Sequence, residues 1–183
     1  MQIKHKKIIL SVFIALIMVT SIAGYIFVPQ DNLNSQTKTY KNHDFVNLNG
    51  RWSTDLNGQQ ISILKSPELI QEQNVVNINT LNSAEKIYLS FNPTENLNRI
   101  LFEINTLLPF LKPRVITSCY EDIKECKSLP LKTCNDATDL NKVIIVKIEN
   151  NTNINYNKNC LEIKGSEEKI LGFIDDLIIS AIS

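Results

Sequence analysis

The sequence predicts an α+β protein: an N-terminal transmembrane helix followed by a mostly antiparallel sheet with two helices packed on one face. Three observations support this fold class. Residues 8–28 form an uncharged apolar run, alternating apolar and polar residues recur from Phe45 onward, and two later stretches carry apolar residues at steps of three and four. Helices that are separated by pairs of strands favour layers in which the helices share one side of the sheet.

The apolar run decides where the rest of the chain is expected to lie. Its 21 residues contain no charge, proline, asparagine or glutamine. A helix of this length covers roughly 31 Å, about the thickness of the hydrocarbon core of a bilayer. Residues 1–7 are basic, and Asp31 is the first charged residue after the run. Since positive flanks stay in the cytoplasm, we expect a single-pass protein with a cytoplasmic N-terminus and its C-terminal domain outside.

The same run has two alternatives to an anchor. Ser21 and Ala23 satisfy the small-residue rule for signal-peptide cleavage after Ala23, which would give a secreted domain. The run is longer than an ordinary signal-peptide core and continues through Val28, so an uncleaved anchor is favoured. A buried helix of a globular core is disfavoured, because such helices rarely lack polar residues over so many turns.

Beyond the anchor, residues 29–41 are polar and aperiodic, which indicates a linker, and residues 42–183 form the predicted extracytoplasmic domain. The chain has 19 basic and 19 acidic residues. Three lysines and no acid precede residue 28, so the remainder carries 16 basic and 19 acidic residues, a net charge of −3. This balance argues against a nucleic-acid partner, which requires a clustered basic face. The expected partners are the lipid bilayer, through residues 8–28, and an unidentified envelope or membrane protein.

The first part of the domain is predicted to be a small antiparallel meander. The pairs Asn49-Gly50 and Asn57-Gly58 favour the positive φ angles of two-residue hairpin turns. Trp52 is expected in the core of this meander, and Ser66 to Leu69 reads as a turn into a short helical piece. The expected strands are 45–48, 52–56 and 60–64, with a further short strand at 75–78.

The second part is predicted to alternate strands with two helices. A half-buried strand at 86–92 ends at Pro93, and a helix is expected to begin at Thr94, whose hydroxyl can cap free N–H groups. The last helix is expected after Ser166, with Asp175 and Asp176 on its exposed face. The remaining strands are expected at 114–118, 143–148, 154–156 and 160–164.

Four cysteines fall in one part of the chain, three of them in a loop at 119–142. An even number of cysteines in a segment expected outside the cytoplasm indicates two disulfides. Three connectivities are possible; we favour one bridge within the loop and one that joins the loop to the fourth cysteine. The spacings lack the close pairs of zinc sites and the C-x-x-C of dithiol oxidoreductases, so no cofactor or metal is expected. The cysteines are Cys119, Cys126, Cys134 and Cys160.

No catalytic motif is present, and the candidate groups have ordinary interpretations. His43 and Asp44 are expected in a loop, because neighbours on an extended chain point to opposite sides and seldom act as a catalytic pair. Asn150 begins a formal glycosylation sequon, Asn150-Asn151-Thr152. The acidic residues of the cysteine loop favour a solvated surface over a weak calcium site, since they lack an EF-hand pattern. These acids are Glu121, Asp122, Glu125, Asp136 and Asp139.

One further layout consists of Trp52, Ser66-Pro67-Glu68-Leu69, Phe91-Asn92-Pro93, the three loop cysteines, and Asn159-Cys160-Leu161 before Gly165. This layout resembles that of uncharacterised single-span membrane proteins of small-genome archaea. The resemblance covers most of the exported part. It implies a single-pass membrane protein, and it brings no known activity and no functional residue.

These features favour a non-enzymatic interaction or assembly module that is tethered to the membrane and faces outside the cytoplasm. The anchor, the linker, the expected disulfides and the missing catalytic motifs support this function. The alternative is an extracytoplasmic enzyme, or a binder of a small ligand or metal, with an acidic site near the cysteine loop.

Overall fold

The computed structural model describes residues 36–181 apart from residue 57 and residues 71–74. The predicted span at 8–28, its basic flank and the cleavage position after Ala23 lie outside these residues. Within 36–56, 58–70 and 75–181, no helix is long and apolar enough to cross a membrane.

The first sheet is an antiparallel meander of four strands in chain order. The predicted turn at Asn49-Gly50 is confirmed, with φ angles of 55° and 84°, and Lys41-Asn42 forms a second such turn with 45° and 65°. Asparagine and glycine tolerate this left-handed region better than other residues. The strands are β1 (Thr37–Tyr40), β2 (His43–Leu48), β3 (Arg51–Leu56) and β4 (Gln59–Ile63). Strand β1 therefore lies within the range 29–41 that was predicted to be a linker.

The second sheet has five strands in the order β6-β5-β7-β9-β8. Strand β5 pairs in parallel with both β6 and β7, and β7 pairs in parallel with β9. Only the β8–β9 hairpin is antiparallel. The strands are β5 (Lys86–Ser90), β6 (Arg114–Ser118), β7 (Asn141–Ile148), β8 (Asn153–Asn157) and β9 (Cys160–Gly165).

The α+β class is confirmed, but the prediction of a mostly antiparallel sheet is wrong for this second sheet. The cysteine loop is long enough to carry the chain from the end of β6 back to the start of β7, so β7 runs parallel to β5. The β8 excursion then returns the chain so that β9 runs parallel to β7. Alternation along each strand reports which face is buried and carries no information about strand direction.

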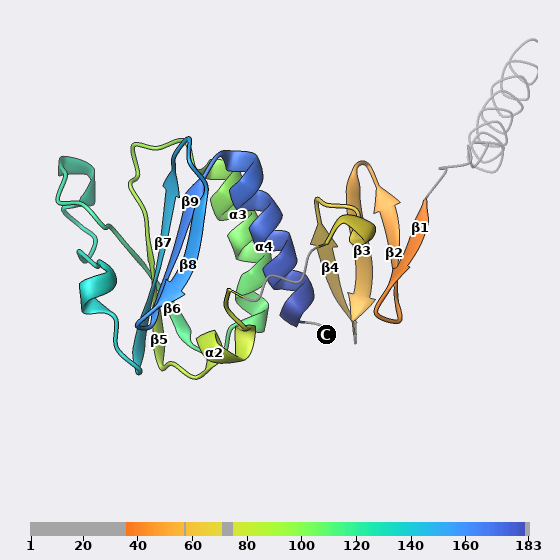
Figure 1. The fold of residues 1–183 in the computed structure, drawn as a ribbon, viewed down its shortest axis with the longest axis horizontal. Helices are drawn as coiled ribbons and strands as arrows, with labels where there is room; N and C mark the ends of the chain where they lie inside the picture. The colour runs from red at the N-terminus through yellow and green to blue at the C-terminus, as the bar shows by residue number, and fades with distance from the viewer. Residues whose placement is uncertain (1–35, 57, 71–74, 182–183) are drawn as a thin grey trace, which may run out of the picture. The chain divides into compact units, whose positions relative to one another are not determined.

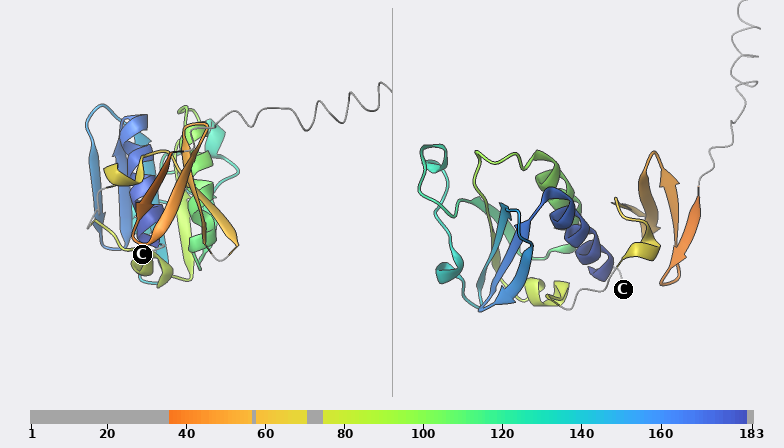
Figure 2. Two further views of the ribbon diagram at one scale, coloured as in Figure 1. Left: turned by 90° about the vertical axis from the view of Figure 1, so that its right-hand side faces the viewer. Right: turned by 45° about the horizontal axis from the view of Figure 1, so that its top comes forward.

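The two long helices lie on one face of the second sheet, as predicted. Helix α3 (Asn98–Leu107) and helix α4 (Glu167–Ala181) share a core with the apolar face of β5, β7 and β9. The cysteine loop packs on the opposite face, over a smaller cluster around Val143, Ile145 and Cys160. Figures 1 and 2 show the helices on one side of this sheet and the loop on the other. Shorter elements are α2 (Ile78–Asn82) and the 3-10 helices Pro67–Leu69, Leu108–Phe110, Lys124–Cys126 and Cys134–Asp136.

Two local predictions are wrong. Residues 75–78 were expected to form a strand, but Asn77 caps helix α2 by accepting a hydrogen bond from the Asn79 N–H. Helix α3 begins at Asn98 and not at Thr94. The Asn92 side chain accepts from both the N–H and the hydroxyl of Thr94, which forms a turn that competes with helix at this point.

The meander is joined to the helices through both apolar and polar contacts. Phe45, Trp52 and Ile63 belong to the same core as the two helices, and Trp52 is 5% exposed, as its predicted core position requires. Arg51 of β3 binds Glu103 of α3, and the residues that follow β4 bind Asp175 of α4. The helices therefore have protein on two sides.

Candidate interaction surface

Both predicted disulfides are present, and no free cysteine remains in the described residues. Cys119 and Cys126 close a bridge within the loop, with 6.0 Å between their Cα atoms. Cys134 is bonded to Cys160 of β9, with 5.2 Å between the Cα atoms. One bridge therefore lies within the loop and the other fastens the loop to the sheet, which is the arrangement favoured from the sequence.

Hydrogen bonds hold the disulfide-bonded loop on the sheet. The Cys119 N–H donates to Pro130 O at 3.0 Å, and the Lys132 N–H donates to Cys119 O at 2.7 Å. The buried Ser90 hydroxyl donates to Lys132 O at 2.7 Å. These bonds extend the β6 edge by one residue pair, Cys119 with Leu131. The loop is therefore attached to the sheet at Cys119 and Ser90 as well as by the Cys134–Cys160 bridge, despite its low apolar content.

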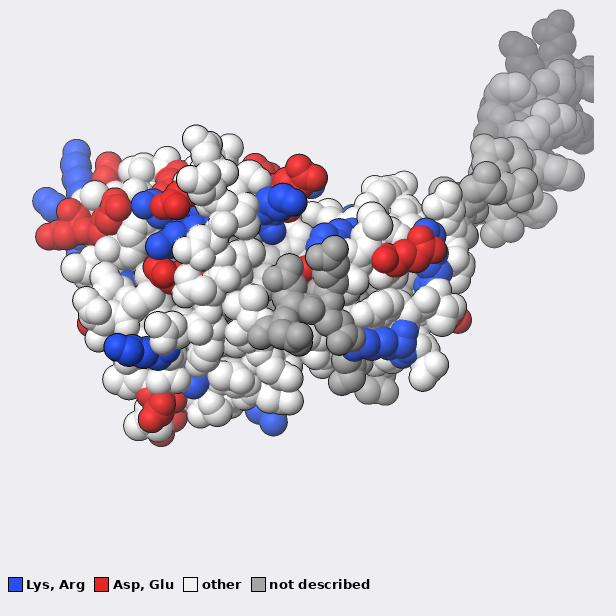
Figure 3. Space-filling model, in the orientation of Figure 1, with Lys and Arg blue, Asp and Glu red and all other residues white. Residues whose placement is uncertain are grey.

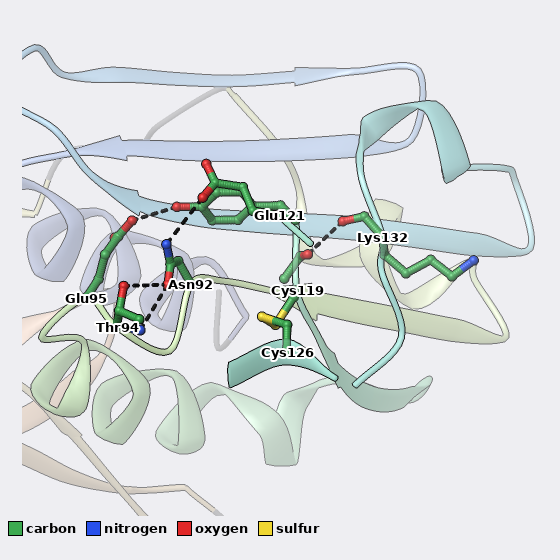
Figure 4. The surroundings of a disulfide bond; sticks show 9 residues. Asn92, Thr94, Glu95, Cys119, Glu121, Cys126 and Lys132 are labelled. Atoms are coloured by element: carbon green, nitrogen blue, oxygen red, sulfur yellow. Dashed lines mark hydrogen bonds between the residues drawn. A yellow bond between two sulfur atoms is a disulfide. The ribbon is translucent and has the colours of Figure 1, made fainter. Parts of the chain in front are cut away.

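Glu95 links the carboxyl ends of three neighbouring strands. It follows β5, accepts the Tyr120 hydroxyl at 2.6 Å after β6, and accepts the Ile148 N–H at 2.9 Å at the end of β7. Figure 4 shows Glu95 beside Asn92 and Thr94, with Glu121 reached by Asn92. Burial and the hydrogen bond to Glu95 both raise the pKa of Tyr120 above its ordinary value, so this phenol stays protonated and donates.

A groove of about 330 Å³ lies between the loop and the exposed part of the sheet. Its floor includes Lys147 of β7 and Lys164 of β9, which are directly opposite each other in the parallel register. Each lysine has a carboxylate partner two residues away in the chain: Glu149, just after β7, lies 2.9 Å from Lys147, and Glu162 of β9 lies 2.8 Å from Lys164. The ion pair with Lys164 lowers the pKa of Glu162. We call this groove the loop groove; both of its lysines are ion-paired with glutamates.

The other candidates from the sequence do not assemble into a catalytic or metal site. Among the described residues, no group of three or more His, Cys, Asp or Glu side chains could hold a metal ion. Glu121, Asp122 and Glu125 are exposed, and Asn150 is exposed on the turn before β8. Figure 3 shows acidic and basic side chains interspersed on the face that it presents.

The remaining predicted residues have structural neighbours. Asp136 accepts the Thr133 N–H at 2.8 Å, and this hydrogen bond lowers its pKa. Asp139 accepts from the Asn159 side chain at 2.8 Å. His43 begins β2, not a loop, and the neighbouring Asp44 accepts the Thr39 hydroxyl at 2.6 Å.

Asp175 and Asp176 were expected to be exposed, and this prediction is wrong. They are 1% and 4% exposed, because α4 has the five-stranded sheet on one side and the end of β4 on another. Asp175 accepts the Leu64 N–H at 3.1 Å and the Lys65 N–H at 2.7 Å. Lys65 places its ammonium 3.0 Å from Asp176 and donates to Gly172 O at 3.1 Å. Burial raises the pKa of Asp175 to about 6 against the opposing effect of the two N–H groups.

These carboxylates lie at the base of an open cavity of about 870 Å³ beside the first half of α4. The cavity has an apolar part formed by Leu64, Leu171 and Ile154, and a charged rim that includes Arg99. The Lys65 N–H binds Asp175, and the Lys65 ammonium binds the Gly172 carbonyl of α4. These groups therefore join the end of β4 to the helix and have a structural role.

A different surface combines exposure with a fixed geometry. Phe102 of α3 is 61% exposed, and the Arg51 guanidinium lies 5.9 Å from the centre of its ring. Arg51 is held by a bidentate ion pair with Glu103, at 2.7 Å and 2.8 Å, and Glu103 is 2% exposed. This ion pair raises the pKa of Arg51. Leu48, 42% exposed, lies directly opposite Arg51 in the β2–β3 register. We call Leu48, Arg51 and Phe102 the Phe102 patch.

The sequence contains a signal for part of this patch. Glu103 lies three residues after Ile100 and four before Leu107, both on the apolar stripe of α3. A carboxylate beside such a stripe needs a cation or hydrogen-bond donors as partners. The identity of that cation, Arg51, depends on how the meander lies against α3, which periodicity does not report.

Comparisons of the chain with protein-family models, with curated proteins and with solved structures found no match. The geometry described above is therefore the basis for proposing a function.

Proposed function

We propose that this protein is a membrane-anchored interaction module without enzymatic activity, which faces outside the cytoplasm and binds a protein of the same envelope or membrane through the Phe102 patch. The two disulfides support an oxidising location. The uncharged run at 8–28 supports the anchor and the orientation.

The exposure of Phe102 beside an arginine that a buried carboxylate holds in place is the observation that carries this proposal. Aromatic and arginine side chains supply most of the binding energy in protein interfaces. Phe102 gains little for the fold at 61% exposure, whereas its cationic neighbour is fixed by a buried carboxylate. A partner that covers the Arg51 guanidinium therefore has little freedom of that side chain left to remove, which is the usual advantage of preorganised contacts. Leu48 extends the apolar area beside the guanidinium.

The test uses the full chain in its own membranes with a photo-crosslinking amino acid at one position at a time. Positions 48 and 102 lie in the patch, and the exposed Thr138 of the cysteine loop is the matched control outside it. We expect one discrete adduct from positions 48 and 102 and none from position 138. Arg51→Lys should reduce the adduct, because lysine keeps the charge but loses the planar fork that binds Glu103 bidentately.

Two results would contradict the proposal. The first is the absence of any adduct from both patch positions. The second is an identical set of adducts from position 138, which would show non-specific neighbours in the membrane. If the Phe102→Ala chain retains the adduct from position 48, Phe102 does not contribute to the interface.

The loop groove supports a second candidate, the binding of a small polar ligand such as a short glycan. Its volume of about 330 Å³ falls at the lower end of ordinary ligand sites. Lys147, Lys164 and Glu162 line it and supply both hydrogen-bond donors and an acceptor. A panel of glycans and divalent cations should then raise the melting temperature of the wild-type chain and not of Lys147→Ala or of a Glu121, Asp122, Glu125 triple amide variant. No shift with any member of the panel would leave this candidate without support.

A further inference from the structure

Strand β8 is the outer strand of the five-stranded sheet, and in the described residues it pairs with β9 alone. Figure 2 shows it at the edge of the sheet, across from β6. All five of its residues, Asn-Ile-Asn-Tyr-Asn, are uncharged. Natural edge strands are commonly blocked by charges, prolines or bulges, because an open edge is a template for another strand.

The other edge strands of the described chain are less open. Strand β1 carries Lys38, which is ion-paired with Glu68, and β6 begins with Arg114. Strand β4 runs into the junction with α4, where the Leu64 N–H binds Asp175. The β8 edge therefore differs from the rest in having neither a charge nor a covering contact of this kind.

The register of the β8–β9 hairpin identifies the free backbone groups. Its turn is Lys158-Asn159, with φ angles of 47° and 66°, and it joins the pair Asn157 and Cys160. In a two-residue hairpin the pair that flanks the turn is hydrogen-bonded, and bonded and non-bonded pairs then alternate. Asn157, Asn155 and Asn153 are therefore bonded to β9. The N–H and C=O groups of Ile154 and Tyr156 point to the open edge.

We infer that this edge binds the same edge of a second copy of the chain, antiparallel and centred on Asn155. Of the antiparallel registers centred on one residue of β8, only this one pairs both Ile154 and Tyr156 within the strand. Ile154 of one copy then faces Tyr156 of the other, and Tyr156 faces Ile154, so that all four free N–H and C=O groups of each strand find partners. The result is a two-fold symmetric dimer with one continuous sheet.

Side chains agree with this register on both faces of the sheet. Ile154 and Tyr156 pack partly against the core on the helix side, and the pairing places each beside the other type, a favourable combination of β-branched and aromatic residues. On the opposite face Asn155 meets Asn155 of the other copy, and Asn153 meets Asn157. No like charges are opposed within the strand. This inference does not depend on the Phe102 patch or on the proposed function.

The experiment uses the full chain in detergent micelles with single cysteines placed on β8. In the inferred register residue 155 lies on the two-fold axis in a non-bonded pair, where Cα atoms approach within about 4.5 Å, close enough for a disulfide. Asn155→Cys should form a reducible dimer under mild oxidation. Asn157→Cys is the matched control on the same strand and face, and alone it should form no disulfide cross-link, because two copies of position 157 lie roughly 13 Å apart.

A mixture of Asn153→Cys and Asn157→Cys chains should give a reducible dimer that neither chain gives alone, which tests the register directly. Asn155→Lys, which opposes two like charges at the axis, should abolish the dimer of the otherwise unmodified chain in light scattering, with Trp52 fluorescence reporting an intact fold. A dimer of unchanged amount in Asn155→Lys, or equal cross-linking by Asn155→Cys and Asn157→Cys alone, would overturn the inference. The first would place any dimer contact elsewhere, and the second would indicate random collision.

Discussion

Lys65 and Gly172 are in direct contact: the ammonium donates to the Gly172 carbonyl at 3.1 Å, and a Cβ atom added at 172 would lie 3.0 Å from the Lys65 Cε. The same ammonium is 3.0 Å from Asp176, which is 4% exposed. A glycine inside a helix costs about 1 kcal/mol relative to alanine. At position 172 glycine leaves room for the Lys65 side chain, which reaches from the end of β4 to the helix.

Gly172→Ala is therefore expected to destabilise the protein despite the better helix propensity of alanine, because the new methyl group would lie 3.0 Å from the Lys65 Cε and 3.2 Å from its Nζ, so the ammonium bound to Asp176 has to shift. Lys65→Ala removes both atoms that the methyl group would meet. In that background Gly172→Ala should stabilise by up to about 1 kcal/mol. Urea unfolding of the four chains, followed by the fluorescence of the single tryptophan, measures this reversal of sign. An equal effect of Gly172→Ala in both backgrounds would show that the contact with Lys65 is not what requires glycine.

Asp175 predicts a specific pH dependence of stability. Burial raises its pKa from 3.8 to about 6 in the folded state. The folded state therefore holds more protons than the unfolded state between these values, so this group's contribution to stability is largest below pH 3.8 and falls as the pH rises to about 6. Above that range its contribution is constant.

Asp175→Asn removes this titration. Relative to the wild type, the variant should gain on the order of 2 kcal/mol in unfolding free energy between pH 4 and pH 7, on top of a pH-independent loss of hydrogen bonds to Leu64 and Lys65. Urea midpoints of both chains across this range measure the difference, in which the titration of all other groups cancels to first order. Parallel curves would mean that Asp175 titrates at its ordinary value in the folded protein.

The wrong prediction that Asp175 is exposed has a physical origin. The spacing of apolar residues identifies all buried positions of a helix only if the helix is covered on a single face. Helix α4 is covered by the sheet on one side and by the end of β4 on another. Its acids are then satisfied by Lys65 and by backbone N–H groups 110 residues away in the chain. A local pattern contains no record of such distant partners.

Features determined locally were predicted well. The turn at Asn49-Gly50 and the strand at 143–148 follow from φ preferences and from continuous apolar sequence, and both are present. The disulfides followed from the number and position of the cysteines. The Phe102 patch joins β2, β3 and α3, so it depends on tertiary packing. Only the carboxylate of Glu103 beside an apolar stripe hinted at it.

The two disulfides are expected to differ in their contribution to stability. Cys134 and Cys160 are separated by 26 positions in the chain, whereas Cys119 and Cys126 are separated by 7. In the chain-entropy model the longer loop contributes about 1 kcal/mol more, roughly 3.5 against 2.5 kcal/mol. Paired Cys→Ala variants of each bridge, unfolded in urea, measure the two costs. A larger cost for the Cys119–Cys126 pair would show that packing of the buried sulfurs outweighs loop closure.

Variants of Arg51 and Phe102 should distinguish an effect on stability from an effect on binding. Arg51→Ala leaves Glu103 buried without its bidentate partner. We expect a loss of about 2 kcal/mol, less than for a fully buried pair because the Arg51 side chain is 30% exposed and solvent screens part of the interaction. Phe102→Ala, at 61% exposure, should change the unfolding free energy by less than about 0.5 kcal/mol.

The double variant Arg51→Ala, Glu103→Gln distinguishes a lost ion pair from lost packing. If the cost of Arg51→Ala comes from the uncompensated carboxylate, Glu103→Gln should recover much of it, because a neutral amide needs no cation. If the aliphatic part of Arg51 supplies the stability, the double variant should be at least as unstable as Arg51→Ala alone. Urea unfolding of the single and double variants decides between the two, and recovery together with a near-neutral Phe102→Ala would leave Phe102 available for binding without a structural role.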